Sequence, residues 1–298
     1  MDNPTLWKIA LEAEPAIVAH YQPVFDKYIA ENGLEGWMVG LLLAAVTFEP
    51  EATTSSHLQV RGPYNACEVY LTRLATAAEK GYMSEKSPGE YRLTVFGRSE
   101  VEGLIDETRS LMARVDPLPV KESQRLVSLL DSLVQSNLNT PPPPDTWSIR
   151  LSAKLLPTPI QSLPYIEQAI SCLNAYRDDA HLAAWQTTGI SAIALETLTL
   201  VWRGEVNSLD GLCYKLDRRG HPCHVFSLAL ENLREYRYIG GSDDAVHITK
   251  LGHTFRDRVE DDTNRFFYKP WACISDAEKV EIADLLSHLR DGLRALLK

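Results

Sequence analysis

A short basic segment in the last third of the chain carries the residue types that bind phosphate groups. Lys215, Arg218, Arg219 and His221 lie close together around a glycine, Gly220. Lysine and arginine side chains neutralise the phosphates of nucleic acids, and such contacts supply most of the sequence-independent affinity. A solvated surface turn has the same composition, so the segment predicts either a phosphate-binding turn or a charged turn without a ligand.

The same segment contains sulfur and imidazole groups of the kind that ligate metal ions. Four such residues are close in sequence: Cys213, His221, Cys223 and His224. Structural zinc sites, however, usually arrange their ligands in two closely spaced pairs, as in C-x-x-C. Cys67 stands 156 positions before Cys223 with no adjacent histidine, which favours a small apolar residue at the start of a helix in both places. We therefore predict no metal and no other cofactor. The odd number of cysteines, scattered and without C-x-x-C, predicts free thiols in a reducing cytoplasm; they are Cys67, Cys172, Cys213, Cys223 and Cys273.

The elements that must position the basic segment are predicted by residues 217–252. After the turn, Phe226, Leu230 and Leu233 recur at the spacing of one helical face. Residues 236–239 and 246–249 predict two strands, joined by a tip of two glycines, a serine and two aspartates. Thr249 and Gly252, in the pattern L/I-T-x-x-G, then begin another helix. This order is that of the second half of a winged helix-turn-helix.

The chain contains this pattern twice. A shift of 156 positions aligns one apolar series with another, and after the ribbon the shift is 155 because the second tip is one residue shorter. The first series is Tyr70, Leu74, Tyr82, Met83, Leu93, Thr94 and Gly97, and the second is Phe226, Leu230, Tyr238, Ile239, Ile248, Thr249 and Gly252. Thr108 and Thr263 also match, each directly after two acidic residues. These residues could line a pocket, but we expect them to be exposed positions of a helix. Matches at so constant an offset predict an internal duplication.

Capping residues, glycines and prolines predict where the helices of both units begin and end. The first unit, residues 1–136, predicts helices over 6–31 (interrupted at Pro15 and Pro23), 37–48, 54–60, 64–80, 98–114 and 122–136. The second unit, residues 160–298, predicts helices over 165–184, 193–202, 208–216, 254–267 and from Ser275 to the end, besides the one after Gly220. Residues 137–159 are rich in proline and predict a stiff, extended linker.

Three stretches of the second unit carry a family resemblance: HLAAWQTTGIS (181–191), LTLVWRGEVNSLDGL (198–212) and VEDDTNRFFYKPW (259–271). With the order of elements, they make the chain resemble the MarR type of winged helix-turn-helix, and more closely the actinobacterial tandem winged-helix proteins. The resemblance implies a mainly α fold with small β wings, in which two duplicated units share a helical body as a single-chain pseudo-dimer. It also implies recognition helices that reach major grooves about 34 Å apart.

The resemblance further implies an aromatic or hydrophobic small-molecule effector in the crevice between body and winged module. Five large side chains of the second unit are the candidates for this pocket: Trp185, Trp202, Phe266, Phe267 and Trp271. Packing of the same aromatic residues in an ordinary core is the alternative.

Double-stranded DNA is the expected partner of the two winged modules. The predicted contacts are Lys215, Arg218, Arg219, His221, His224 and Arg234 in the second unit and Asn65, Arg73, Lys86 and Arg92 in the first. The whole chain carries a net charge of −10, but residues 37–98 hold six basic and six acidic residues, and residues 189–253 hold seven and eight. The acidic excess therefore lies in the helical body, although Asp243 and Asp244 at the second wing tip oppose phosphate binding.

Several function classes find no support in the sequence. The longest apolar run, residues 38–46, is too short to span a bilayer, and the first residues do not resemble a signal peptide. G-x-S-x-G, H-E-x-x-H, P-loop and G-x-G-x-x-G motifs are missing, so an enzyme is not expected. We therefore predict a cytoplasmic DNA-binding transcriptional regulator that responds to a small molecule. The alternative is a winged-helix scaffold that has lost DNA binding and serves as a ligand-binding or protein-interaction module.

Overall fold

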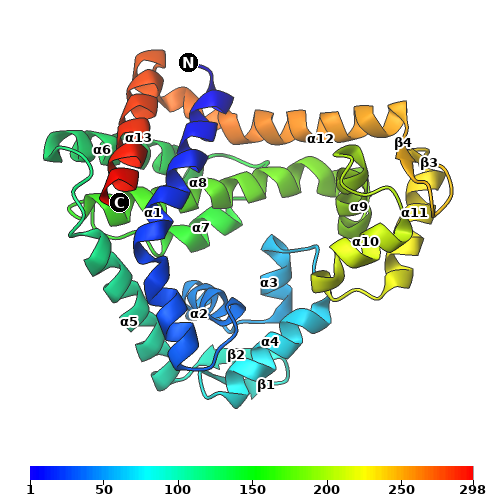
Figure 1. Ribbon diagram of the computed structural model, residues 1–298, viewed down its shortest axis with the longest axis horizontal. Coiled ribbons are helices and arrows are strands. Elements are labelled where there is room, and N and C mark those ends of the chain that lie inside the picture. Colours follow the sequence, from blue (N-terminus) through cyan, green and yellow to red (C-terminus); the bar gives the residue numbers. More distant parts are fainter. Residues whose placement is uncertain (298) are drawn as a thin grey trace.

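The computed structural model describes residues 1–297 and is mainly helical, with two small antiparallel sheets (Figure 1). The first half comprises α1 (Asn3–Glu31), α2 (Trp37–Phe48), α3 (Ser55–Arg61), α4 (Cys67–Glu79), β1 (Met83–Ser87), β2 (Glu90–Leu93), α5 (Val95–Met112) and α6 (Val120–Leu138). After α7 (Trp147–Ala153), the second half comprises α8 (Ser162–Trp185), α9 (Ala192–Trp202), α10 (Leu209–Lys215), α11 (Cys223–Glu235), β3 (Ile239–Gly240), β4 (His247–Ile248), α12 (Lys250–Tyr268) and α13 (Asp276–Leu296). Three short 3-10 turns, η1 (Gln186–Thr188), η2 (Asp217–Arg219) and η3 (Lys269–Cys273), join elements of the second half.

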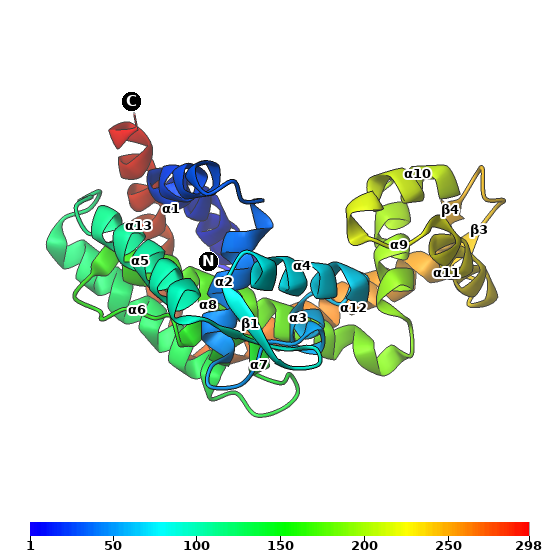
Figure 2. The same ribbon diagram turned by 90° about the horizontal axis from the view of Figure 1, so that it is seen from below.

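Three hydrophobic cores organise these elements. The largest lies in a helical body and contains buried residues of α1, α6, α8 and α13. A second core lies among α9, α10, α11 and the adjoining strands, and a third lies among α2, α4 and the β1–β2 ribbon. Each small core therefore belongs to a module of three helices and a two-stranded ribbon: α2–α4 with β1 and β2 form the first module, and α9–α11 with β3 and β4 form the second. Figure 2 shows the second module standing away from the body at the ends of α8 and α12.

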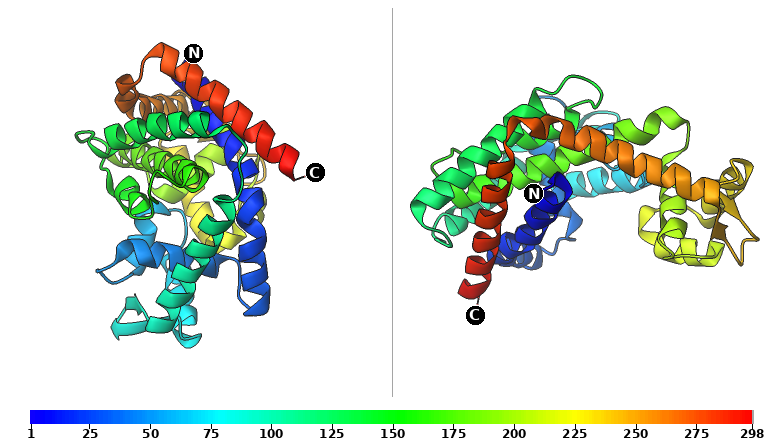
Figure 3. Two further views of the ribbon diagram at one scale, coloured as in Figure 1. Left: turned by 90° about the vertical axis from the view of Figure 1, so that its left-hand side faces the viewer. Right: turned by 90° about the horizontal axis from the view of Figure 1, so that it is seen from above.

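The body is built by an exchange of helices between the two halves. The last helix, α13, packs along α1, and α6 packs along α8 (Figure 3). Within each half, α1 contacts α5 and α8 contacts α12. Each half thus completes its core with the terminal helix of the other, so the two halves form one body.

The threonine–glycine pattern after each ribbon has the same geometry in both halves. Thr94 and Thr249 cap α5 and α12, and their Oγ1 atoms accept the backbone N–H groups of Gly97 at 2.9 Å and Gly252 at 3.1 Å. A Cβ atom on Gly97 would lie 1.9 Å from the carbonyl oxygen of Tyr82, and one on Gly252 would lie 2.1 Å from that of Tyr238. Only glycine therefore lets each helix begin against the residue that directly precedes the first strand of its ribbon.

The first helix differs from the sequence prediction. It runs without interruption from Asn3 to Glu31, although Pro15 and Pro23 lie inside it. Both prolines are exposed, whereas Leu6, Trp7 and Ile17 on other positions of α1 are buried in the body. Packing along the buried side therefore outweighs the hydrogen bonds that proline removes from a helix.

The expected linker also differs, because part of it is a helix packed on the body. Helix α7 buries Ile149, and the carboxylate of Asp179 on α8 accepts the backbone N–H groups of Ser148 at 2.9 Å and Ile149 at 3.1 Å. These are donors that an isolated helix leaves unsatisfied at its N-terminus. The cap comes from a residue about thirty positions away, so the local sequence does not reveal it.

The lengths and hydropathy of the helices decide whether any of them could span a membrane. None of those over residues 1–297 is both long and apolar enough to cross a bilayer.

Candidate nucleic-acid interface

Helices α10 and α11, with the turn between them, place the basic segment on the second module. The Oγ of Ser208 caps α10 by accepting the N–H of Gly211 at 3.1 Å. Leu216 and Phe226 are buried on either side of the turn, so Arg218 and its neighbours are forced outward. Gly220 adopts a positive φ of 74° that lets the chain reverse before α11.

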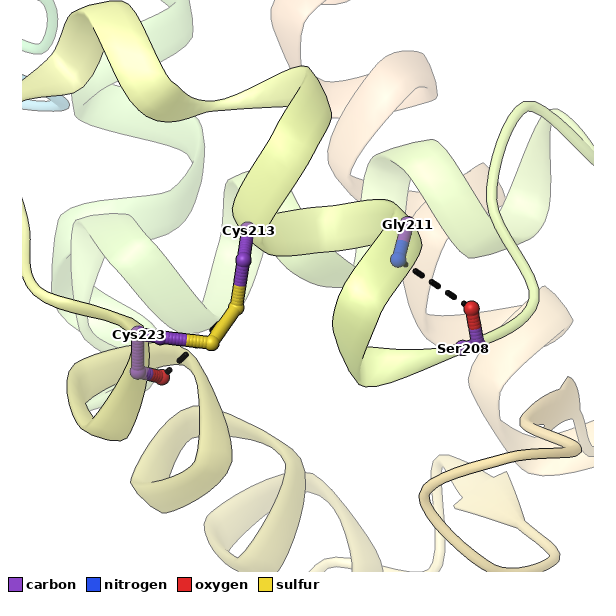
Figure 4. Close-up of a disulfide and its surroundings, with 4 residues drawn as sticks. All are labelled: Ser208, Gly211, Cys213 and Cys223. Atoms are coloured by element: carbon purple, nitrogen blue, oxygen red, sulfur yellow. Dashed lines mark hydrogen bonds between the residues drawn. A yellow bond between two sulfur atoms is a disulfide. The ribbon is translucent and has the colours of Figure 1, made fainter.

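A disulfide closes this turn, contrary to the predicted free thiols. Cys213 on α10 and Cys223, the first residue of α11, are bonded with their Cα atoms 5.3 Å apart (Figure 4). Cys223 does begin a helix, as the alignment with Cys67 suggested, but it is exposed and disulfide-bonded and does not serve there as a small apolar residue. Their spacing carried no signal for a bond, because the two cysteines become neighbours only when the helix pair folds. In residues 1–297 no group of three potential metal ligands occurs, and Cys67, Cys172 and Cys273 are free thiols.

The basic turn contacts the first half of the chain. The guanidinium of Arg219 donates to Oδ1 of Asn65 at 3.1 Å, and the N–H of Ala66 donates to the carbonyl oxygen of Arg219 at 2.8 Å. The His221 ring lies 3.0 Å from the carbonyl oxygen of Tyr64. We call residues 61–66 and 217–221, which meet here, the paired turns. They bring together three of the predicted DNA contacts, Asn65, Arg219 and His221, but the partner of each is protein.

A second set of contacts extends the paired turns onto the helical body. Arg61 forms an ion pair with Asp178 at 2.6 Å, and the hydroxyl of Tyr64 lies 3.1 Å from Nε2 of His181. Arg219 also pairs with Glu196 on α9 at 2.5 Å. Burial raises the pKa of Glu196 even though Arg219 opposes that shift, and burial raises the pKa of Tyr64 to about 12. Glu196 is 14% exposed at its side chain, so the Arg219 pair is partly shielded from water.

The paired turns change the spacing of the two expected recognition helices. Helix α4 starts at Cys67 and not at the predicted residue 64, because residues 64–66 form the contact. Cys67 follows Ala66 directly, and Cys223 is the fourth residue after Arg219. The N-terminal ends of α4 and α11 therefore lie at most about 25 Å apart by chain length. This arrangement differs from the expected spacing of about 34 Å.

Four further predicted contacts are engaged inside their own modules. Lys215 pairs with Glu205 at 2.9 Å, and Arg234 pairs with Asp243 of the wing tip at 2.7 Å. The guanidinium of Arg73 lies over the Trp37 ring, 5.4 Å from its centroid, and that of Arg92 donates a hydrogen bond to the carbonyl oxygen of Pro50. The remaining three, Arg218, His224 and Lys86, are exposed, and no ion pair or side-chain hydrogen bond engages them within residues 1–297.

Residues 152–296 match a family described as a helix-turn-helix family. This part of the chain is a helix-turn-helix domain. No curated protein and no solved structure matches the chain. The helix-turn-helix domain extends from the end of α7 to the end of α13, so it includes α10, the basic turn and α11.

A charged cavity of about 470 Å³ lies between α1, α8, α9 and α12, and Tyr64 of the paired turns also lines it. Arg177, Arg203 and Arg256 line it together with Asp178, Glu196 and Glu260, while Trp7, Leu11 and Leu200 supply apolar wall. Asp178 and Glu196 pair with Arg61 and Arg219, which lie in the paired turns. Arg177 and Arg256 both pair with Glu260, at 2.8 and 3.1 Å, and Arg203 lies 3.8 Å from Glu205. Arg256 is 4% exposed, and its Nη1 atom has no hydrogen-bond partner in the described residues.

Thr263 and His181 also line this cavity, which the sequence did not predict. Thr263, predicted to be exposed, is buried, and its Oγ1 lies 3.2 Å from Nδ1 of His181. Burial lowers the pKa of His181 to about 4, so the ring is neutral around pH 7. The match between Thr108 and Thr263 was the available signal, because Thr108 is also buried and lines a smaller cavity of about 240 Å³ in the first half.

The aromatic residues predicted to form a pocket are placed elsewhere. Phe267 and Trp271 lie in the core of the body, where their ring centroids are 5.3 Å apart. Trp185 is buried in the core of the second module. Trp202 lies beneath the guanidinium of Arg256 at 5.0 Å, and Phe266 lies beneath that of Arg265 at 4.4 Å. The charged cavity is lined by a different set of residues.

Proposed function

We propose that this protein is a DNA-binding transcriptional regulator with two winged helix-turn-helix units of the MarR type in one chain. The observation that carries the proposal is the helix-turn-helix domain at residues 152–296, with its basic turn. The first half repeats its order of helix, short helix, helix, ribbon and long helix. Both halves also share the threonine cap and the obligatory glycine, which supports an internal duplication and a pseudo-dimer. The units proposed are 1–136 and 160–298, and the site of action proposed is the cytoplasm.

The exposed basic residues are the proposed first contacts with DNA. Arg218 and His224 flank the start of α11, and Lys86 lies on β1 of the first wing. Each phosphate contact contributes to the salt dependence of binding. The paired turns must separate before both recognition helices can reach successive major grooves, and this separation would add Arg219, His221 and Asn65 to the interface.

The test is fluorescence anisotropy with mixed-sequence duplex DNA at about 50 and 200 mM salt. We expect affinity to fall steeply with salt, and Arg218→Ala and Lys86→Ala each to reduce the salt slope by about one. Lys121→Ala, an exposed lysine on α6, is the matched control and should bind as the wild type does. Failure to bind at the lower salt under both oxidising and reducing conditions would refute the regulator.

A second candidate function is a winged-helix scaffold that binds ligands or proteins and no longer binds DNA. The specific observation in its favour is that seven of the ten predicted DNA contacts already have protein partners. The acidic tip of the second wing supports it too, although Asp243 is neutralised by Arg234. The anisotropy measurement distinguishes the two functions directly.

A small anionic effector is the ligand class that the charged cavity favours for either function. Arg177 and Arg256 share the single carboxylate of Glu260, at 2.8 and 3.1 Å, which leaves a local excess of one positive charge. Trp7, Leu11 and Leu200 offer an apolar wall to the body of such a ligand. The cavity volume is within the range of small-molecule sites. Its charge differs from the lipophilic crevice that the family resemblance implied.

Benzoate and inorganic phosphate are suitable probes for isothermal titration calorimetry. We expect benzoate to bind and Arg203→Ala to weaken it at least tenfold, since Arg203 is half-exposed and can be removed without burying a charge. Binding of phosphate alone would limit the effector to a polar oxyanion. No heat with either probe, or equal affinity in Arg203→Ala, would reject the anion site.

A further inference from the structure

The disulfide between Cys213 and Cys223 spans the residues that hold the two halves of the chain together. The nine residues between the two cysteines include Arg219, Gly220 and His221, all of which reach the first half. A Cβ atom on Gly220 would lie 2.3 Å from Cγ2 of Val69 on α4, which shows how closely the turns approach. The geometry of the disulfide-closed segment therefore sets the geometry of the paired turns.

The first half provides an internal comparison for the role of this bond. The positions 156 before Cys213 and Cys223 are His57 on α3 and Cys67 at the start of α4. Cys67 is a free thiol, yet α3 and α4 form the same kind of helix pair. A helix pair of this type thus does not require a disulfide to fold, and the bond in the second half has some other consequence.

The bond is also placed for exchange with external thiols. Cys223 is exposed and Cys213 is partly exposed, and their neighbour Tyr214 is 89% exposed. A disulfide within reach of solvent exchanges with thiolates far more readily than a buried one. In the reducing cytoplasm proposed above, disulfides are usually transient and redox-sensing.

We propose that Cys213–Cys223 is a reversible redox site that locks the paired turns, so that its reduction releases the first winged module from the second. An external dithiol supplies two electrons and two protons. Its thiolate attacks one sulfur of the bond, which forms a mixed disulfide and releases the other cysteine as a thiol. The second thiol of the dithiol then attacks the mixed disulfide and releases the remaining cysteine. The products are two protein thiols and the oxidised, cyclised dithiol. Residues 214–222 then lose their closure, and the contacts of Arg219 and His221 with Asn65 and Tyr64 loosen.

Hydrogen–deuterium exchange of the full-length protein tests this lock without DNA, so its result is independent of the proposed function. The N–H of Ala66 donates to Arg219, and its protection therefore reports contact between the turns. We expect dithiothreitol to accelerate exchange in the peptide around residues 63–67 at least tenfold, while peptides of α13 stay unchanged. A purely local effect, confined to residues 209–235, would overturn the proposal, as would no effect at all.

Two sets of variants sharpen the outcome. Cys213→Ser with Cys223→Ser should show the fast exchange around Ala66 with or without the dithiol. Arg219→Ala should show it even with the disulfide intact, whereas Arg218→Ala, an exposed neighbour, should behave as the oxidised wild type does. If the double serine variant fails to fold, reduction of the wild-type protein remains decisive. An Arg219→Ala protein that keeps slow exchange around Ala66 would contradict the lock.

Discussion

Replacing one glycine of α5 by alanine should strongly destabilise the protein, whereas replacing another glycine of the same helix should stabilise it. In Gly97→Ala the new Cβ would lie 1.9 Å from the carbonyl oxygen of Tyr82 and 2.7 Å from its carbonyl carbon. These are backbone atoms, so α5 itself must move by more than about 1 Å to regain contact distance. That movement breaks the hydrogen bonds of Thr94 to the carbonyl oxygens of Gly81 at 2.7 Å and Tyr82 at 3.0 Å.

The magnitude follows from the contacts that are lost. A lost N-cap costs about 1 kcal/mol, a lost backbone hydrogen bond about 1 kcal/mol, and overpacking about 1–3 kcal/mol. Alanine returns about 1 kcal/mol of helix propensity. We therefore expect Gly97→Ala to lower the free energy of unfolding by about 3 kcal/mol. Gly103 lies exposed in α5, and a Cβ atom added there would have no neighbour within 4 Å among the described residues, so Gly103→Ala should raise it by up to about 1 kcal/mol.

Urea unfolding followed by circular dichroism at 222 nm measures both variants against the wild type. The same substitution at Gly252, where the Cβ would lie 2.1 Å from the carbonyl oxygen of Tyr238, should repeat the loss in the second half. If Gly97→Ala unfolds within about 0.5 kcal/mol of Gly103→Ala, close approach to the strand is not the reason for glycine at this position.

The other predictions concern two buried titratable groups and one helix cap. Burial lowers the pKa of His181 to about 4 in the folded protein, so between pH 6.5 and 4 only the unfolded chain binds this proton, and the free energy of unfolding falls as the pH is lowered. Urea unfolding at pH 7 and at pH 5 should therefore show that His181→Phe loses about 1–2 kcal/mol less than the wild type does. Asp179 should have the opposite effect on the pH dependence of stability, because burial raises its pKa to about 6 and the folded state keeps the proton that the unfolded chain has already released. The free energy of unfolding of the wild type, relative to that of Asp179→Asn, should therefore fall by about 2–3 kcal/mol as the pH rises from 4 to 7. The side chain of Ser275 and that of Glu278 form a capping box at α13, and Ser275→Ala should lower the thermal midpoint by an amount equivalent to about 1 kcal/mol.

Local signals in the sequence predicted the elements well where the stabilising groups are close in the chain. Helix α2 begins at Trp37 and ends at Phe48, as predicted, because an apolar run is followed by Glu49-Pro50. Ser208 and Ser275 cap the helices that were predicted to begin at these residues, since a capping hydroxyl acts only three residues away. The helix-turn-helix of the second half was recognisable for the same reason.

Features that depend on distant residues were not predictable. Helix α7 needs a cap from Asp179, and α1 tolerates Pro15 because its other side is buried in the body. The basic turn is the most consequential case for function. Its composition indicated phosphate binding, but Arg219 pairs with Glu196 and Asn65, and neither residue is near it in sequence.

The two cavities show what a single chain with two similar halves can do that a homodimer of identical chains cannot. Five positions that line one cavity correspond to five that line the other at offsets of 156 or 155 residues: Tyr21 with Arg177, Phe25 with His181, Leu43 with Thr199, Ile105 with Glu260 and Thr108 with Thr263. Four of these five pairs exchange an aromatic or aliphatic side chain for a charged or polar one, and the polar cavity is the larger. In a homodimer each substitution would appear on both sides, so charge and volume would change together in both crevices. Under the proposed duplication, one half is free to keep a smaller site with a single arginine and a single glutamate, Arg109 and Glu167, while the other holds three arginines beside the paired turns. A ligand bound there would contact Tyr64 and His181, the pair that joins the first module to the body, and so would act on the same contact that the disulfide restrains.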